Sequence, residues 1–365
     1  MAATTSFRPR GARLPILVIA LGVVLLAVGI WFVAGRSDGS PVTPAQGIPV
    51  AVAVPTRVTE LTPVGHGAVT TWKIPVALVG LRSVAIGPDG RVWVTEQNLA
   101  EVASLDGNEL TRYAVTAISD NAGAFSFGWG PDGALWFTGY PGGSLGRVMP
   151  DGRVNLFESR GEAATTLGIA AASDGSIWTT DPNLGAVVRV GSDGTVTPVV
   201  VSADGGRTQR PGFIVAGSGD QMWFTIPDTS QVATVSTTGD HGITRYTVPG
   251  LVTPRNIVAA GDGTYWVTLE DKAALAHVDG STGHVAVVPL HGAIPTDGLN
   301  DLALAQDGTL WITTPSDTVL HVSTSGRVLA RVAIAGASYA DGITVAPDGA
   351  VWVAARDDII AKITP

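Results

Sequence analysis

A tryptophan recurs seven times along this chain, at a nearly constant interval of 41 to 45 residues. In six copies it follows an Asp-Gly pair, as in Asp132, Gly133 and Trp136, and in the copy at Trp223 the Asp and Gly are exchanged. The seven tryptophans are Trp93, Trp136, Trp178, Trp223, Trp266, Trp311 and Trp352. A repeat of this length, with short β-branched runs between tight turns, is typical of a β-propeller blade.

Each repeat has room for four strands. In the second repeat we expect strands over 125–130, 134–138, 145–149 and 153–158, with Asp-Gly turns between the first pair and the last pair. Asp bonds its own backbone in such a turn, and Gly supplies the positive φ. The sequence therefore predicts an all-β fold, a seven-bladed β-propeller over residues 68–365. We expect each tryptophan to fill the space between blades rather than to bind a ligand.

The two ends of the repeat array predict how the ring closes. After Trp352 only 13 residues remain, enough for two strands and too few for an outer one. The segment 69–75 resembles the outer strand expected at 243–249. We therefore predict that it completes the last blade, which closes the ring and removes free sheet edges.

An apolar segment precedes the repeats. Residues 14–35 carry no charge, and Arg8, Arg10 and Arg13 come just before them. A helix of this length spans a bilayer, and the arginines keep its first end in the cytoplasm. We predict a single-pass anchor at the cell membrane with an extracytoplasmic propeller, a cleaved signal peptide being the alternative. The expected organisation is a cytoplasmic tail 1–13, a transmembrane helix 14–35, a Pro/Val/Thr-rich linker 36–67 and the propeller 68–365.

Composition excludes several classes of function. Acidic residues number 31 against 22 basic ones, a net charge of −9, so we expect no nucleic-acid partner. There is no cysteine, which excludes disulfides, thiolate metal sites and cysteine catalysis. We expect a monomeric propeller.

Short segments of the repeats carry a resemblance to a known family. Trp-Phe-Thr at 136–138, Trp-Val-Thr-Glu at 93–96 and Ser-Leu-Gly-Arg-Val at 144–148 resemble the repeats of the virginiamycin B lyase family. The resemblance covers residues 68–365 and implies a propeller that opens a cyclic depsipeptide by elimination across an ester. It also implies a magnesium ion and a histidine base at the start of inner strands, eleven residues before the tryptophan.

This chain departs from that pattern at the implied base. The seven corresponding positions hold Arg82, Phe125, Leu167, Gly212, Arg255, Asn300 and Asp341. None is a histidine, which puts the family reaction in doubt. The catalytic candidates that remain are Asp341, Asp301 and His291, the last in a loop expected on the same face.

Oxygen-bearing side chains gather at three neighbouring inner-strand starts. They are Asn256, Asn300, Asp301 and Asp341, and the segments 299–301 and 340–343 resemble metal-binding segments of gluconolactonase-like propellers. Such ligands suit Mg²⁺ or Ca²⁺. The alternative is that Asn and Asp begin strands because they tolerate turns.

The expected ligand-binding face combines inner-strand starts with the loops after second strands. We assign to it Glu96, Arg82, Arg255, Asn256 and Asn300. Acidic residues are frequent in those loops, which favours a cation or a cationic ligand. Two hypotheses follow: a module that binds or senses a small molecule or a surface partner, or an enzyme, either a divergent lyase or a metal-dependent lactonase-like hydrolase. The sequence does not identify the ligand.

Overall fold

A computed structural model describes the repeat region and part of the segment before it. The described residues are 51–53, 55–76, 79–115, 123–130, 132–140, 145–157, 166–190, 196–201, 209–292 and 298–365. The expected tail 1–13, the expected transmembrane helix 14–35 and the first part of the expected linker lie outside them. No helix in these described ranges is long and apolar enough to span a membrane.

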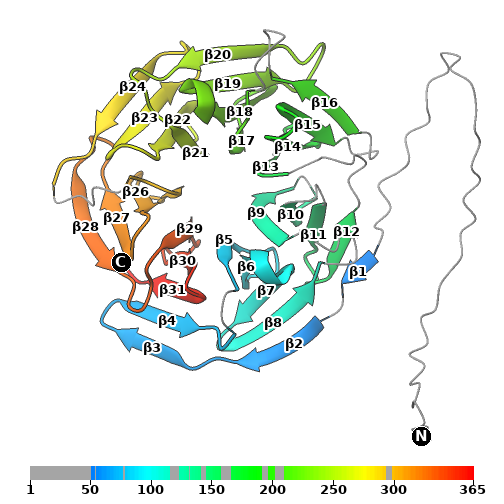
Figure 1. Cartoon of the computed structure of the whole chain (residues 1–365), viewed down its shortest axis with the longest axis vertical. Helices are drawn as coiled ribbons and strands as arrows, with labels where there is room; N and C mark the ends of the chain where they lie inside the picture. Colours follow the sequence, from blue (N-terminus) through cyan, green and yellow to red (C-terminus); the bar gives the residue numbers. More distant parts are fainter. Residues whose placement is uncertain are drawn as a thin grey trace, which may run out of the picture. The chain divides into compact units, whose positions relative to one another are not determined.

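Seven antiparallel sheets are arranged in a ring around a central channel, which confirms the predicted seven-bladed β-propeller (Figure 1). The innermost strand comes first in each blade and faces the channel. Blade 1 contains β5 (Leu81–Ile86), β6 (Val92–Glu96), β7 (Glu101–Asp106) and β8 (Glu109–Ala114). Blade 2 contains β9 (Gly123–Trp129), β10 (Leu135–Tyr140), β11 (Leu145–Val148) and β12 (Val154–Phe157). Blade 3 contains β13 (Ile169–Ala171), β14 (Ile177–Asp181), β15 (Ala186–Val190) and β16 (Val196–Val200).

The remaining blades repeat this order. Blade 4 contains β17 (Ile214–Ala216), β18 (Gln221–Ile226), β19 (Gln231–Ser236) and β20 (Ile243–Thr247). Blade 5 contains β21 (Pro254–Ala259), β22 (Thr264–Leu269), β23 (Ala274–Asp279) and β24 (Val285–Pro289). Blade 6 contains β25 (Leu302–Leu304), β26 (Leu310–Thr313), β27 (Thr318–Val322) and β28 (Val328–Ala333). Blade 7 begins with β29 (Ala340–Val345), β30 (Val351–Ala355) and β31 (Ile359–Ile363). Two 3-10 turns, η1 (Gln97–Leu99) and η2 (Pro227–Thr229), follow second strands.

The ring closes through the N-terminal segment, as predicted. Strand β4 (Val69–Lys73) pairs antiparallel with β31, in a register that places Ile359 opposite Lys73 and Ile363 opposite Val69. The last blade therefore combines strands from both ends of the repeat array.

Residues 51–53, 55–60 and 63–66, which we assigned to the linker, form strands instead. We call β1 (Ala51–Ala53), β2 (Pro55–Glu60) and β3 (Pro63–His66) the N-terminal strap. They add a fifth, outermost strand to blades 2, 1 and 7 respectively, so the strap runs around three consecutive blades (Figure 1). Its Val and Thr residues favour extended backbone, and the outer edges of the blades supply the hydrogen-bonding partners.

The repeated tryptophans are structural, as expected. Trp93, Trp178 and Trp223 are fully buried, and Trp352 is the half-buried exception. Two turn aspartates also bond their tryptophans: Asp132 Oδ1 accepts from the Trp136 indole N–H at 3.2 Å, and Asp89 Oδ1 accepts from the Trp93 indole N–H at 3.0 Å and from the backbone N–H two residues on. The Asp-Gly repeats therefore serve turn formation and packing.

A threonine two residues after the tryptophan joins neighbouring inner strands. The Thr95 hydroxyl donates to the Phe125 carbonyl of the next blade at 3.0 Å and accepts from the Ser83 N–H at 2.9 Å. Six blades have this arrangement, through Thr95, Thr138, Thr180, Thr225, Thr268 and Thr313. Blade 7 has Ala354 at the same position. These bridges fix the inner-strand starts around one end of the channel.

Candidate functional site

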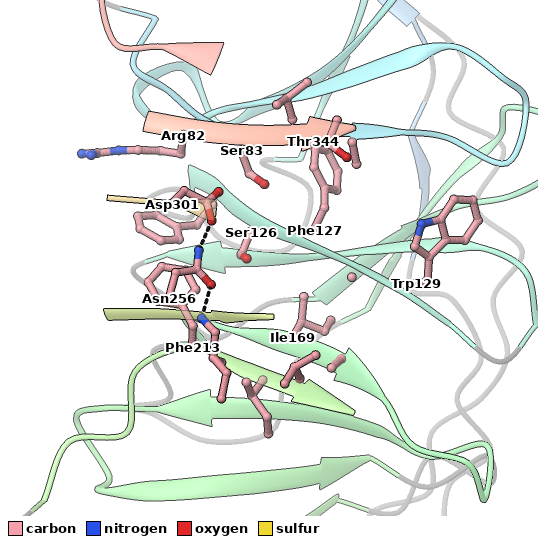
Figure 2. Close-up of a pocket in the computed structure, with 18 of the residues that line it drawn as sticks. Arg82, Ser83, Ser126, Phe127, Trp129, Ile169, Phe213, Asn256, Asp301 and Thr344 are labelled. Carbon is pink, nitrogen blue, oxygen red and sulfur yellow. Dashed lines mark hydrogen bonds between the residues drawn. The ribbon is translucent and has the colours of Figure 1, made fainter. Parts of the chain in front are cut away.

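The central channel contains a cavity of about 410 Å³ lined by inner-strand residues of all seven blades. Figure 2 shows its layers, with Arg82 toward one end and Trp129 toward the other. Between them lie first polar side chains, among them Asn256 and Asp301, and then apolar ones such as Phe127. We call the end formed by Arg82, Arg255 and Asp341 the channel mouth, because these residues occupy equivalent positions at the starts of inner strands.

Three arginines surround one carboxylate at the channel mouth. Asp341 Oδ2 accepts a hydrogen bond from Arg82 Nη1 at 3.1 Å and another from Arg356 Nε at 2.7 Å. Arg255 Nη2 lies 3.7 Å from the other oxygen, Oδ1. The side chain of Asp341 is 9% exposed. We call Arg82, Arg255 and Arg356 the arginine cluster.

Asp301 lies one layer deeper and is held by N–H donors. Its Oδ1 accepts hydrogen bonds from the Asn256 amide (Figure 2) and from the Leu302 backbone N–H at 2.7 Å. Its Oδ2 accepts from the Ile343 N–H of blade 7 at 3.2 Å. Burial raises the pKa of Asp301 to about 7. The backbone N–H donors oppose that rise, because they favour the ionised form. This carboxylate thus links blades 5, 6 and 7 around the channel.

The four residues considered for a metal do not form one oxygen cage. Asn300 is buried and does not line the cavity: its Nδ2 donates to the Ala340 carbonyl at 2.8 Å, and its Oδ1 accepts from the Tyr339 hydroxyl at 3.1 Å. The Asp341 carboxylate faces guanidinium groups, which repel a cation. Among the described residues, no group of three or more His, Asp or Glu is arranged to hold a metal ion. The donors present therefore do not fit Mg²⁺ or Ca²⁺.

Glu96 differs from our expectation that it lies on the binding face. It is buried within blade 1, where Arg112 Nε contacts its two carboxylate oxygens at 3.0 and 2.9 Å. Burial raises the pKa of Glu96 to about 7, and the Arg112 charge opposes that rise. The pair is part of the blade interior and does not reach a ligand at the mouth.

His291 also lies away from the cavity. It is exposed and follows β24, and its backbone bonds to Gly326 and Val328 at the outer strand of blade 6. Two other histidines stack on repeat tryptophans, His277 on Trp266 and His321 on Trp311. None of these three histidines lines the cavity, so they do not form a catalytic arrangement there.

Sequence reasoning missed Arg356 and the aromatic wall of the cavity. Arg356 follows the second strand of blade 7 and lies 3.8 Å over the Tyr339 ring. The loops after second strands were considered only for their acidic residues. The same geometry brings a basic residue, Arg356, to the mouth. Phe125 and Phe213 line the cavity, and the Arg82 guanidinium lies over the Phe125 ring at 5.7 Å.

Fold and cavity together define a class: a seven-bladed propeller with a small-molecule-sized cavity at one end of its channel. A model of the virginiamycin B lyase family matches residues 67–363, so the chain belongs to that family and the resemblance is confirmed. A virginiamycin B lyase of Nocardia farcinica (strain IFM 10152) is 30% identical over 221 residues, which cover 60% of this chain and 73% of the relative.

Solved structures agree on the fold. A streptogramin B lyase structure has a TM-score of 0.73 at 20% identity and covers 81% of this chain and 97% of its own. The virginiamycin B lyase of Staphylococcus aureus has a TM-score of 0.72 at 20% identity and covers 81% of this chain and 99% of its own. A catalytically inactive variant of that enzyme has been solved with quinupristin, at 19% identity to this chain.

Proposed function

We propose that this chain is a binding member of the virginiamycin B lyase family, which holds a ligand at the channel mouth and does not open streptogramin rings. The observation that carries the proposal is the state of Asp341, the carboxylate at the position where the resemblance implies a base. A general base must bring an oxygen lone pair within hydrogen-bonding reach of the proton that it removes, and at Asp341 the arginines compete with a substrate for that contact. Two arginine N–H groups occupy one oxygen of Asp341, and a third arginine flanks the other.

The chemistry of the channel mouth supports the same proposal. The family reaction is expected to use Mg²⁺, whereas the cavity mouth presents guanidinium groups in contact with its central carboxylate. A protein that only binds a ligand needs neither a general base nor a metal ion. The cavity provides the enclosed surface that such binding requires.

We also propose that residues 14–35 anchor the propeller outside the cytoplasm. The uncharged run and the preceding Arg8, Arg10 and Arg13 support this topology. Protease added to intact cells should digest the propeller, and carbonate washing should leave the protein in the membrane. A soluble fragment beginning near Arg36 would instead establish the cleaved signal peptide.

The second candidate is a divergent lyase, which the family membership itself favours. The test is to incubate the full chain, in a neutral detergent, with virginiamycin B and Mg²⁺ and to follow ring opening by mass. The Staphylococcus aureus lyase is the positive control. We expect no opening beyond the rate without protein, because removal of a general base costs about 10²–10⁴ in rate. Opening at a rate comparable with the control would overturn the binding proposal.

A further inference from the structure

The arginine cluster has many uncommitted hydrogen-bond donors. Each guanidinium carries five N–H groups, yet the three arginines make four hydrogen bonds among the described residues: two from Arg82, one from Arg255 and one from Arg356. Within that part of the chain, Nη2 of Arg82, Nη2 of Arg255 and both terminal nitrogens of Arg356 donate to no acceptor. A planar fork of such donors matches a carboxylate.

The charge at the mouth also favours an anion. Two described carboxylates lie within 4 Å of the cluster: Asp341, which contacts all three arginines, and Glu270, which lies 2.8 Å from Arg255 Nη1. Three positive and two negative charges leave one positive charge at the mouth. Asp301, one layer deeper, interacts with Arg255, and its ionised form offsets part of that charge. A single carboxylate therefore suits the mouth better than a phosphate dianion, which would exceed the positive charge.

Below the mouth the cavity wall becomes apolar. Phe213 lies in the same layer as Asn256 and Asp301, and Phe127 and Ile169 lie deeper, toward Trp129 (Figure 2). Ala170 and Val215 continue this wall on blades 3 and 4. A ligand that reaches from the arginines into the channel therefore meets hydrocarbon after its charged end, which favours an apolar body. A volume of about 410 Å³ accommodates a small organic molecule.

We propose that the channel binds a small amphipathic carboxylate, its carboxylate at Arg255 and Arg82 and its aromatic or aliphatic body against Phe213 and Phe127. This inference rests on the proposed binding function and reverses the expectation of a cationic ligand, which followed from loop acids. Those acids have internal partners: the carboxylate of Asp228, for example, pairs with Arg210.

The test uses matched pairs that differ only in charge. The full chain in a neutral detergent is titrated, by calorimetry, with 3-phenylpropionate and octanoate, with their neutral amides, with phenethylamine and with inorganic phosphate. At least one carboxylate should bind about tenfold more tightly than its amide, because the neutral amide cannot accept the charge-assisted hydrogen bond from the arginines. The amine and phosphate should bind more weakly than that carboxylate.

Variants locate the site. Arg255→Ala should weaken carboxylate binding about tenfold or more, and Arg210→Ala, on a paired surface arginine outside the cavity, should not change it. Glu270→Gln should tighten binding, because it removes the negative charge that competes for Arg255. If Arg255→Ala does not fold, as judged by circular dichroism, Glu270→Gln still tests whether the carboxylate binds at Arg255.

Three outcomes would overturn the proposal. They are failure of every carboxylate to bind more tightly than its amide, tighter binding of the amine or of phosphate, and carboxylate binding that neither Arg255→Ala nor Glu270→Gln changes. Ring opening of virginiamycin B is a separate readout. A chain that opens the ring refutes the binding function, whereas one that neither opens it nor prefers carboxylates refutes only the ligand class.

Discussion

Replacing Trp223 by alanine tests whether the repeated tryptophans hold neighbouring blades together. Trp223 in β18 is 1% exposed. Its ring stacks between Tyr246 of the same blade, at a centroid distance of 5.2 Å, and Tyr265 of blade 5, at 4.6 Å. Truncation of a buried Phe or Trp costs about 3–5 kcal/mol. We expect the upper end, about 5 kcal/mol, because two aromatic stacks are lost and backbone at Gly217 closes one side of the cavity, which limits collapse.

The assay is chemical unfolding followed by far-ultraviolet circular dichroism, which does not depend on the removed fluorophore. Trp129→Ala provides the matched control, because the same side chain is removed at a position that is 51% exposed. The control should lose about 1 kcal/mol or less. Equal losses for the two variants, or a Trp223→Ala loss below about 1 kcal/mol, would refute the assignment of this tryptophan to inter-blade packing.

Three further changes test other parts of the molecule. Deletion of residues 51–60 should expose the outer edges of blades 1 and 2 and increase aggregation measured by light scattering, whereas unchanged solubility would show that the strap is dispensable. Arg112→Leu should cost about 3–5 kcal/mol in chemical unfolding, because Glu96 remains buried without its partner, and the double change with Glu96→Leu should recover most of that loss. The raised pKa of Asp301 means that the folded chain holds a proton between pH 3.8 and about 7 that the unfolded chain has released, so this carboxylate reduces stability as pH rises through that window. Asp301→Asn should therefore gain stability relative to wild type between pH 5 and pH 8, and a constant difference across that range would contradict the shift.

The sequence predicted the parts of the fold that are periodic or local. The repeat interval, the Asp-Gly turns and the outer-strand pattern of 69–75 each depend on neighbouring residues, so one chain contains enough information to place them. The strap was missed because its strands are three to six residues long. Their pairing depends on blade edges that exist only after the ring has formed. Local propensity does not report such a tertiary partner.

The candidate site was predictable in position and not in orientation. Asn300 and Asp341 both lie eleven residues before a repeat tryptophan, yet Asn300 bonds into blade 7 while Asp341 lines the cavity. The repeat fixes the backbone position, whereas the available partners decide where the side chain points. The same limit explains why charge counting favoured a cation. The acidic loop residues are numerous, but they bond to other groups of the protein. The arginines therefore determine the charge at the mouth.

Two members of the arginine cluster, Arg82 and Arg356, contact Asp341 where blade 7 meets blade 1, and among the described residues this is the junction between blades that lacks a threonine bridge. Blade 7 has Ala354 where the other blades have threonine, so no hydroxyl spans the gap to blade 1. The backbones approach closely there, since a Cβ on Gly342 would fall 2.5 Å from the Arg82 carbonyl oxygen. The side-chain bond from Arg82 to Asp341 then joins the two inner strands in place of the missing bridge. This is also the blade that β4 closes. Ala354, Gly342 and the Arg82–Asp341 ion pair therefore belong to one arrangement at this junction, and a ligand that competed for Arg82 would weaken a contact between the first and last blades.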